Sequence, residues 1–195
     1  MKRSGVCSNT MATYHLDAAQ LKEAAPTLKT FDRVYLSGTV YTARDAAHKR
    51  IAALIREGKE LPFPLEGAAI YYAGPTPSPE HLPIGSCGPT TSGRMDVYAP
   101  QLLDLGLTAM IGKGERKPPV VEAIVRNKGV YFCAVGGAGA LACKSITSCE
   151  VIAFEDLGCE SVKRLTLREF PLIVAIDSEG TDIFRSGREE YLKQK

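Results

Sequence analysis

The sequence predicts a mixed α/β fold in which helices are interspersed between strands. Three observations predict it. Apolar runs rich in Val, Ile and Tyr alternate with segments of helical periodicity along most of the chain. Gly and Pro residues separate these segments. Finally, the 195 residues are 45% hydrophobic and 24% charged, which is ordinary for one globular domain that buries a core.

In the first half of the chain, one helix is predicted between strands. Thr42-Ala-Arg-Asp45 fits the S/T-x-x-D/E pattern, so a helix is predicted to open there. Apolar residues at spacings of three and four continue it toward Gly58, which is expected to end it. A proline-rich loop over 74–89 follows. Strands with β-branched and aromatic character are predicted around these elements, over 33–37, 39–42 and 68–73.

The second half keeps the same alternation. Helices are predicted over 98–105 and 120–127, each followed by a glycine. The turn over 177–180 is expected to close a hairpin. Five strands are predicted in this half, over 107–111, 130–135, 150–154, 162–167 and 172–176.

Charge and hydropathy exclude two classes of partner. Lys and Arg number 24 against 22 Asp and Glu, a net charge of +2 that is too small for binding nucleic acid or a membrane surface by charge alone. No apolar run approaches the length of a membrane span, and the basic start Met1-Lys2-Arg3 leads into polar residues. We therefore expect a cytoplasmic protein that binds neither nucleic acid nor membrane.

The six cysteines are expected to be reduced thiols. A chain of this length without an export signal has no need of disulfides. Their spacing contains no C-x-x-C pair, so no self-contained metal site is predicted. They are Cys7, Cys87, Cys133, Cys143, Cys149 and Cys159.

Two glycine motifs invite a nucleotide-binding interpretation. Gly137-x-Gly139-x-x-Ala142 follows an apolar strand as a dinucleotide fingerprint does, but only 39 residues follow Asp156, too few to complete such a domain. The glycines at 136, 137 and 139 are interpreted mainly as close backbone packing, with a turn that faces an anion as the alternative. Gly112-Lys113-Gly114 lacks the glycine and the Ser or Thr of a phosphate loop, and leaves a lysine where backbone can approach a ligand closely.

The segment 85–96 is the densest candidate for a binding site. It combines glycines, three consecutive hydroxyl residues and an arginine just before a predicted helix. Backbone N–H groups, hydroxyls and a guanidinium together suit one small anion, such as a carboxylate or a phosphate. The alternative is a polar turn that only caps the helix.

Three segments carry a resemblance to a known family: 88–96 (GPTTSGRMD), 37–49 (SGTVYTARDAAHK) and 110–114 (MIGKG). Together they resemble the β subunit of the two-subunit class I fumarate hydratases and L-tartrate dehydratases, equivalent to the C-terminal domain of the single-chain enzymes. The resemblance implies a swivelling β/β/α domain, with a mixed sheet flanked by helices, over 15–195. Residues 1–14 are then an N-terminal extension.

The resemblance also implies a heteromeric hydro-lyase. A [4Fe-4S] cluster is expected on a partner α subunit, in an α2β2-type assembly, with no metal held by this chain. Arg44, Arg94 and Lys113 are expected to bind the carboxylates of a C4 dicarboxylate. Thr90 is expected to transfer a proton, with Arg94 and Lys113 also catalytic, and Thr91 to add a hydrogen bond.

The expected reaction is the reversible hydration of fumarate to L-malate in the tricarboxylic acid cycle. The motifs do not separate it from the dehydration of L-tartrate to oxaloacetate. A stand-alone anion-binding or dinucleotide-binding module remains a third alternative. An unactivated threonine hydroxyl is a poor base, and the sequence shows no activator for Thr90, so the partner subunit is expected to supply one.

Overall fold

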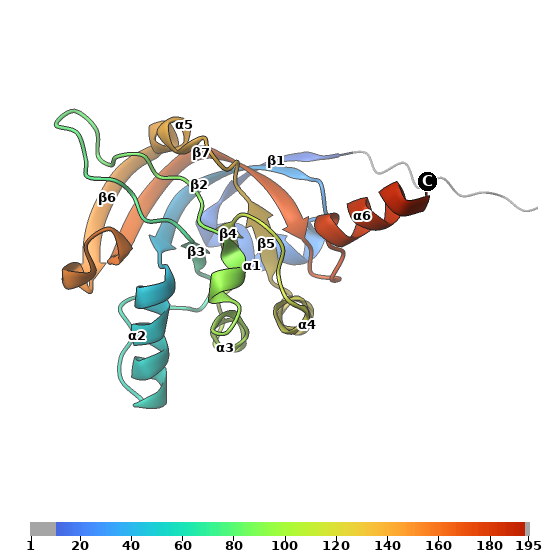
Figure 1. Ribbon diagram of the computed structural model, residues 1–195, viewed down its shortest axis with the longest axis horizontal. Coiled ribbons are helices and arrows are strands. Elements are labelled where there is room, and N and C mark those ends of the chain that lie inside the picture. Colours follow the sequence, from blue (N-terminus) through green and yellow to red (C-terminus); the bar gives the residue numbers. More distant parts are fainter. Residues whose placement is uncertain (1–10, 194–195) are drawn as a thin grey trace, which may run out of the picture.

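The computed structural model describes residues 11–193 and shows a strongly curved sheet flanked by helices (Figure 1). Seven strands form the sheet in the order β1-β2-β3-β4-β5-β7-β6. The predicted mixed α/β fold, with a mixed sheet flanked by helices, is confirmed. The strands are β1 (Thr13–Asp17), β2 (Arg33–Thr42), β3 (Ala69–Tyr71), β4 (Ala109–Gly112), β5 (Val130–Cys133), β6 (Ile146–Ala153) and β7 (Val162–Ile176).

The sheet closes on itself through β7. Strands β1 to β5 pair in parallel, each with the next. The long strand β7 runs antiparallel to β5 and β6 and also to β2. The pairing therefore passes from β2 through β3, β4, β5 and β7 back to β2, so these five strands form a closed ring. Buried side chains cover both faces of this ring.

The helices are α1 (Leu21–Ala24), α2 (Asp45–Arg56), α3 (Ala99–Asp104), α4 (Pro118–Asn127), α5 (Gly139–Ala142) and α6 (Ile183–Lys193). Figure 1 shows α2, α3 and α4 on one side of the sheet. Alternate strand residues serve two cores. Tyr71 and Phe132 belong to the inner one, whereas Met110 and Tyr131 pack outward in a cluster that includes buried residues of α2, α3 and α4.

The helices predicted over 98–105 and 120–127 are confirmed as α3 and α4, with slightly different ends. The prediction of separate strands is wrong in two places. Residues 33–42 form one strand, and so do residues 162–176. Positive φ angles of 94° at Gly38 and 50° at Glu169 bend these strands locally while their pairing continues on both sides of each bend. A β-bulge interrupts a ladder without ending the strand.

Two other local predictions are wrong. Helix α2 begins at Asp45 and not at Thr42, because Thr42 ends β2 and its hydroxyl oxygen accepts the Lys163 N–H at 3.1 Å. The turn over 177–180 is present, but the chain continues from it into α6, and only the isolated bridge between Ile176 and Asp182 resembles a hairpin. Strand β1 and helix α6 have no counterpart among the predictions.

The expected extension over 1–14 lies mostly outside the described residues, as does Cys7. Within residues 11–193, no helix is both long and apolar enough to cross a bilayer.

Candidate functional site

The candidate residues lie on loops that follow the carboxyl ends of neighbouring strands. Arg44 follows β2, Lys113 follows β4 and Gly136 lies beyond β5. Because β2 to β5 are parallel, these ends share one edge of the sheet, and the loops that leave them lie at that edge. The long connection from β3 to α3 carries the remaining candidates, Thr90, Thr91 and Arg94.

The segment that carries the two threonines is paired to the sheet edge. The Thr90 N–H donates to the carbonyl oxygen of Tyr72 at 2.7 Å. Thr91 forms a parallel bridge with Lys113. Thr90 is half-buried and Thr91 is exposed. The structure therefore brings Thr91 and Lys113 side by side, as expected for members of one site.

Ser92 fixes the Lys113 backbone beneath this segment. The Ser92 N–H donates to the Lys113 carbonyl at 2.9 Å, and the Lys113 N–H donates to Ser92 Oγ at 3.1 Å. The hydroxyl of Tyr131 lies 2.9 Å from Ser92 Oγ. A Cβ at Gly112 would lie 1.9 Å from that Oγ. At Gly112, the backbone of the Gly-Lys-Gly segment is therefore in close contact with Ser92 of this chain, whereas room for a ligand was expected from the sequence.

A buried ion pair supports the end of the same loop. Asp96 Oδ1 accepts from Arg116 Nε at 2.7 Å, with side-chain exposures of 2% and 0%. Asp96 Oδ2 accepts the Lys117 N–H at 2.8 Å. The Arg116 guanidinium lies over the rings of Tyr131 and Tyr72, at 4.9 and 5.3 Å. A charge removed from water so completely needs such partners, and the pair ties the loop after β4 to the loop before α3.

Arg44 is the N-cap residue of α2 and lies in a narrow slot. Its side chain is 18% exposed, and its Nη2 lies 3.1 Å from Glu160 Oε1. A Cβ at Gly74 would lie 2.7 Å from Arg44 Nη1, so a side chain there would displace the guanidinium from its present position. Glu160 Oε2 also accepts the Ala46 N–H at 3.1 Å. The first turn of α2 is thus capped by a residue distant in sequence, and not by Thr42.

Arg94 is held by Asp45. Its Nε lies 2.9 Å from Asp45 Oδ1, and its side chain is 52% exposed. Asp45 Oδ2 lies 3.9 Å from Arg44 Nη2. One carboxylate therefore lies between the two arginines that the sequence placed in the site.

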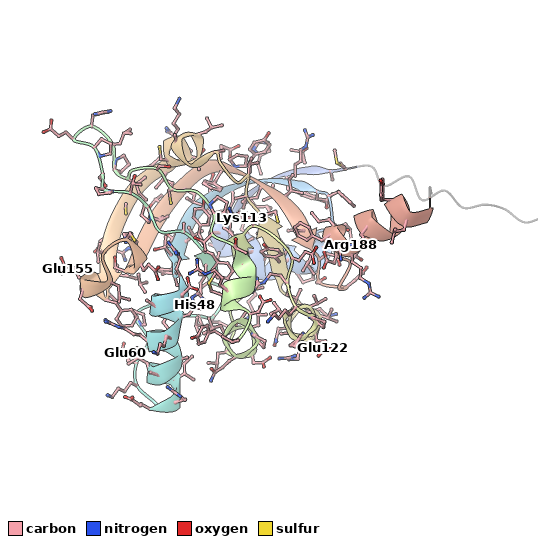
Figure 2. The ribbon with its side chains drawn as sticks, viewed as in Figure 1. His48, Glu60, Lys113, Glu122, Glu155 and Arg188 are labelled. Atoms are coloured by element: carbon pink, nitrogen blue, oxygen red, sulfur yellow. The ribbon has the colours of Figure 1, made fainter. Side chains whose placement is uncertain are left out.

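Lys113 extends over the glycine turn that follows β5. A Cβ at Gly136 would lie 3.4 Å from Lys113 Cδ. The side chain is exposed, and it makes no ion pair with any residue between 11 and 193. Figure 2 shows Lys113 and His48 in the central part of the molecule. Lys113 thus has an ammonium group that is free for an anion.

His48 lies beneath the site in full burial. Its Nδ1 lies 2.9 Å from the Arg44 carbonyl oxygen. Burial lowers the pKa of His48 to about 4. The ring packs edge-on against Tyr72, with centroids 5.5 Å apart. His48 is therefore a neutral core group below Arg44.

The turn over 136–139 packs against the candidate loop. A Cβ at Gly139 would lie 2.5 Å from Ser86 Oγ and 2.9 Å from the Gly88 nitrogen. The Cys87 N–H donates to the Gly139 carbonyl at 3.1 Å. Helix α5 beyond it has four residues, whereas a dinucleotide fingerprint opens a full helix. The interpretation of Gly139 as close backbone packing fits this geometry.

The cysteines are dispersed. Cys87 and Cys143 are buried, Cys133 and Cys149 are half-buried, and Cys159 is exposed. Among the described residues, no group of three or more Cys, His, Asp or Glu side chains could hold a metal ion. These residues do not fit the ligand set of an iron–sulfur cluster.

Sequence reasoning missed the carboxylates and the buried supports of the site. Asp45 is the last residue of the helix-start pattern 42–45, and its position next to Arg44 could have indicated an ion pair. Glu160 gave none, because it lies 114 residues from Ala46 in sequence. Ser92 and Asp96 also stood within the candidate loop, but only the fold shows that they face inward.

A family model described as "Fumarase C-terminus" matches residues 3–187. The chain is 40% identical over 155 residues to "Fumarate hydratase class I, anaerobic" of Escherichia coli, covering 78% of this chain and 28% of that protein. It is 39% identical over 158 residues to "Fumarate hydratase 1, mitochondrial" of Leishmania major, with the same two coverages.

It is also 37% identical over 169 residues to "Putative L(+)-tartrate dehydratase subunit beta" of Methanocaldococcus jannaschii. That match covers 84% of this chain and 87% of the relative. The chain therefore spans little more than a quarter of the two fumarate hydratases, 28% of each, but nearly the whole of a protein named as a β subunit.

Substitution of Gly112 tests the contact that fixes Lys113. Gly112→Ala should lower the free energy of unfolding by about 1–3 kcal/mol, because the new methyl group displaces Ser92 Oγ from its bonds. Urea denaturation measures this change. Gly93→Ala is the matched control, since its Cβ would meet nothing closer than 3.7 Å. Equal losses in both variants would contradict the role given to Gly112.

Acid titration tests the burial of His48. Its folded pKa of about 4 lies below its ordinary 6.5, so the unfolded chain takes up the proton first as the pH falls. The His48 contribution is complete above pH 6.5 and is lost on the way down to about pH 4, a loss of roughly 3 kcal/mol. His48→Asn should abolish this part of the pH dependence, whereas His15→Asn, at an exposed histidine, should leave it. Parallel stability curves for the wild type and His48→Asn would refute the assignment.

Proposed function

The chain belongs to the fumarase C-terminus family, and from this membership we propose that it is the β subunit of an iron–sulfur hydro-lyase. The membership confirms the resemblance drawn from the three motifs. The proposed reaction is the reversible hydration of fumarate to L-malate. The observation that carries the proposal is the gathering of Arg44, Arg94 and Lys113 on loops at one edge of the sheet.

These cations suit a C4 dicarboxylate. Two arginines and a lysine can pair with both carboxylates of the substrate. When the C–H bond next to a carboxylate breaks during dehydration, negative charge builds up on that carboxylate, and fixed cations stabilise it. In this proposal Arg44 binds substrate, and Arg94 and Lys113 bind it and stabilise that charge.

Thr90 is the proposed proton-transfer residue, and Thr91 adds a hydrogen bond. Backbone pairing fixes Thr90 at the site, since its N–H bonds Tyr72. Its hydroxyl makes no hydrogen bond with another residue of the described range. A threonine hydroxyl needs an assisting base, so we propose that the partner supplies one.

The partner is proposed to be an α subunit that carries a [4Fe-4S] cluster, in an α2β2 assembly. The cysteines described above do not fit cluster ligands, so the residues of this chain are assigned only substrate binding and proton transfer. Residues 15–195 form the proposed hydro-lyase domain, with 1–14 as an extension whose last two residues, Thr13 and Tyr14, already pair with β2 as part of β1. We also propose a cytoplasmic location and a place in the tricarboxylic acid cycle.

Dehydration of L-tartrate is the second candidate. A specific observation favours it, because the relative named as a tartrate dehydratase β subunit is matched over 87% of its length. Both substrates carry two carboxylates, so the same cations serve either. A stand-alone anion-binding or dinucleotide-binding module is the remaining alternative.

Reconstitution of the complex tests the proposed function. The chain alone should show no hydro-lyase activity, because half of the site is missing, and activity should appear when it is purified anaerobically with its α subunit. Fumarate and L-tartrate are assayed side by side, and the faster substrate decides between the candidates. A cluster and full turnover on the isolated chain, or full activity in a preparation that lacks it, would refute the β-subunit role.

Substitution of Arg94 tests the cation assignment. In the assembled complex, Arg94→Ala should lower kcat/KM at least about 10–100-fold, because a charge-assisted contact to a carboxylate is lost. Arg94→Lys should recover only part of it, since an ammonium cannot reproduce the fork of a guanidinium. Arg56→Ala is the control, an exposed arginine of α2 whose loss should change the rate less than about threefold. Wild-type kinetics in assembled Arg94→Ala would mean that the loop only caps a helix.

A further inference from the structure

Two carboxylates of this chain hold the two arginines of the proposed site. Asp45 Oδ1 lies 2.9 Å from Arg94 Nε, and Asp45 Oδ2 lies 3.9 Å from Arg44 Nη2. Glu160 Oε1 lies 3.1 Å from Arg44 Nη2. Both acidic side chains are partly buried, with exposures of 33% and 22%. These contacts are therefore better shielded from solvent than an ordinary surface ion pair.

Glu160 is itself anchored from two sides. Its second oxygen, Oε2, accepts the Ala46 N–H at 3.1 Å, which fixes the carboxylate against the first turn of α2. Its turn, Glu155–Glu160, is held by Lys163, whose ammonium donates to the carbonyl of Gly158 at 3.1 Å and to that of Cys159 at 3.2 Å. The direction of Glu160 is thus set before any ligand arrives.

Which nitrogen of the Arg94 guanidinium faces Asp45 determines which nitrogens remain for a substrate carboxylate. The ion pair is closest at Nε, and the two terminal nitrogens of Arg94 make no hydrogen bond with the described part of the chain. A guanidinium held through Nε still presents its two terminal nitrogens as a fork for a carboxylate. Asp45 Oδ2 is buried without a hydrogen-bond partner, so only the nearby charge of Arg44 offsets its burial. Asp45 therefore couples the two arginines.

We propose that Asp45 and Glu160 are positioning residues, which orient Arg94 and Arg44 toward the two carboxylates of the substrate. Asp45 sets the direction of the half-exposed Arg94 and links it to Arg44. Glu160 keeps Arg44 in the slot beside Gly74. This inference rests on the proposed function, and it adds to it the acidic residues on which the geometry of the cations depends.

The kinetic test uses Asp45→Asn and Glu160→Gln in the assembled complex. Each substitution keeps the shape of the side chain and removes its charge. We expect kcat to fall about tenfold in each, with KM changed less than about threefold, because misaligned cations lose more in the transition state than in the bound substrate. Asp156→Asn is the matched control. It breaks the exposed ion pair with Arg50 that joins the same turn to the same helix but touches neither site arginine, and should leave both constants within about twofold.

A second measurement does not depend on turnover. Proton exchange at the Nε–H of Arg94 is followed by NMR on the full chain. Removal of the Asp45 carboxylate should accelerate this exchange about tenfold in Asp45→Asn, since a negative charge beside the N–H repels the hydroxide that catalyses its exchange. Asp156→Asn should leave it unchanged.

The possible results distinguish failure of the positioning role from failure of the proposed hydro-lyase function. A lower KM with unchanged or higher kcat in Asp45→Asn would mean that Asp45 competes with the substrate for Arg94, and would overturn the positioning role. Unchanged Arg94 exchange in that variant would overturn it as well. If the wild-type complex turns over neither fumarate nor L-tartrate, the proposed function fails, and the exchange measurement still decides whether Asp45 holds Arg94.

Discussion

Closure of the sheet by β7 is the constraint on which the rest of the structure depends. This strand pairs with β2 along one side and with β5 and β6 along the other. Between β2 and β5 the strands follow one another in parallel, so the loops that leave their carboxyl ends meet at one edge. The inner face is filled by large side chains such as Tyr71, Phe132 and Phe170. Burial of these rings supplies the stability on which the loops rely.

Beneath the loops, buried polar contacts fix the positions of the loop residues more than they lower the free energy of the folded chain. The Asp96–Arg116 pair is almost fully removed from water, so its attraction is largely offset by desolvation. What the pair achieves is a fixed geometry, since both partners are satisfied in only one arrangement. Ser92 acts in the same way on a smaller scale, because its hydroxyl meets both Lys113 and Tyr131. The loop with Thr90 and Thr91 is therefore fixed relative to Lys113 by groups outside the proposed set of substrate-binding residues.

The sequence predicted the existence of the strands and helices better than their first and last residues. Alternation of apolar and helical segments is a local signal, and it identified β2 to β7 and the helices α2 to α4. It divided β7 in two because the apolar pattern is interrupted over 168–171, whereas pairing with distant β2 keeps the strand continuous. The start of α2 was misplaced for a related reason. Thr42 has the right side chain for a cap, but the sheet uses that hydroxyl, and Glu160 caps the helix from far along the chain. A pattern within four residues contains no information about such a partner.

Under the proposed function, charge gives a reason why this chain needs a partner to complete the site. Arg44, Arg94 and Lys113 bring three positive charges to the edge of the sheet, and Asp45 and Glu160 bring two negative ones. The balance favours a small anion but does not neutralise the two carboxylates of a C4 substrate. A desolvated complex with that excess negative charge is unfavourable unless further positive groups face it. Under the proposed function, these groups come from the α subunit. Substrate then binds tightly only at the interface of the two subunits, where the positive groups of both chains act on the same two carboxylates.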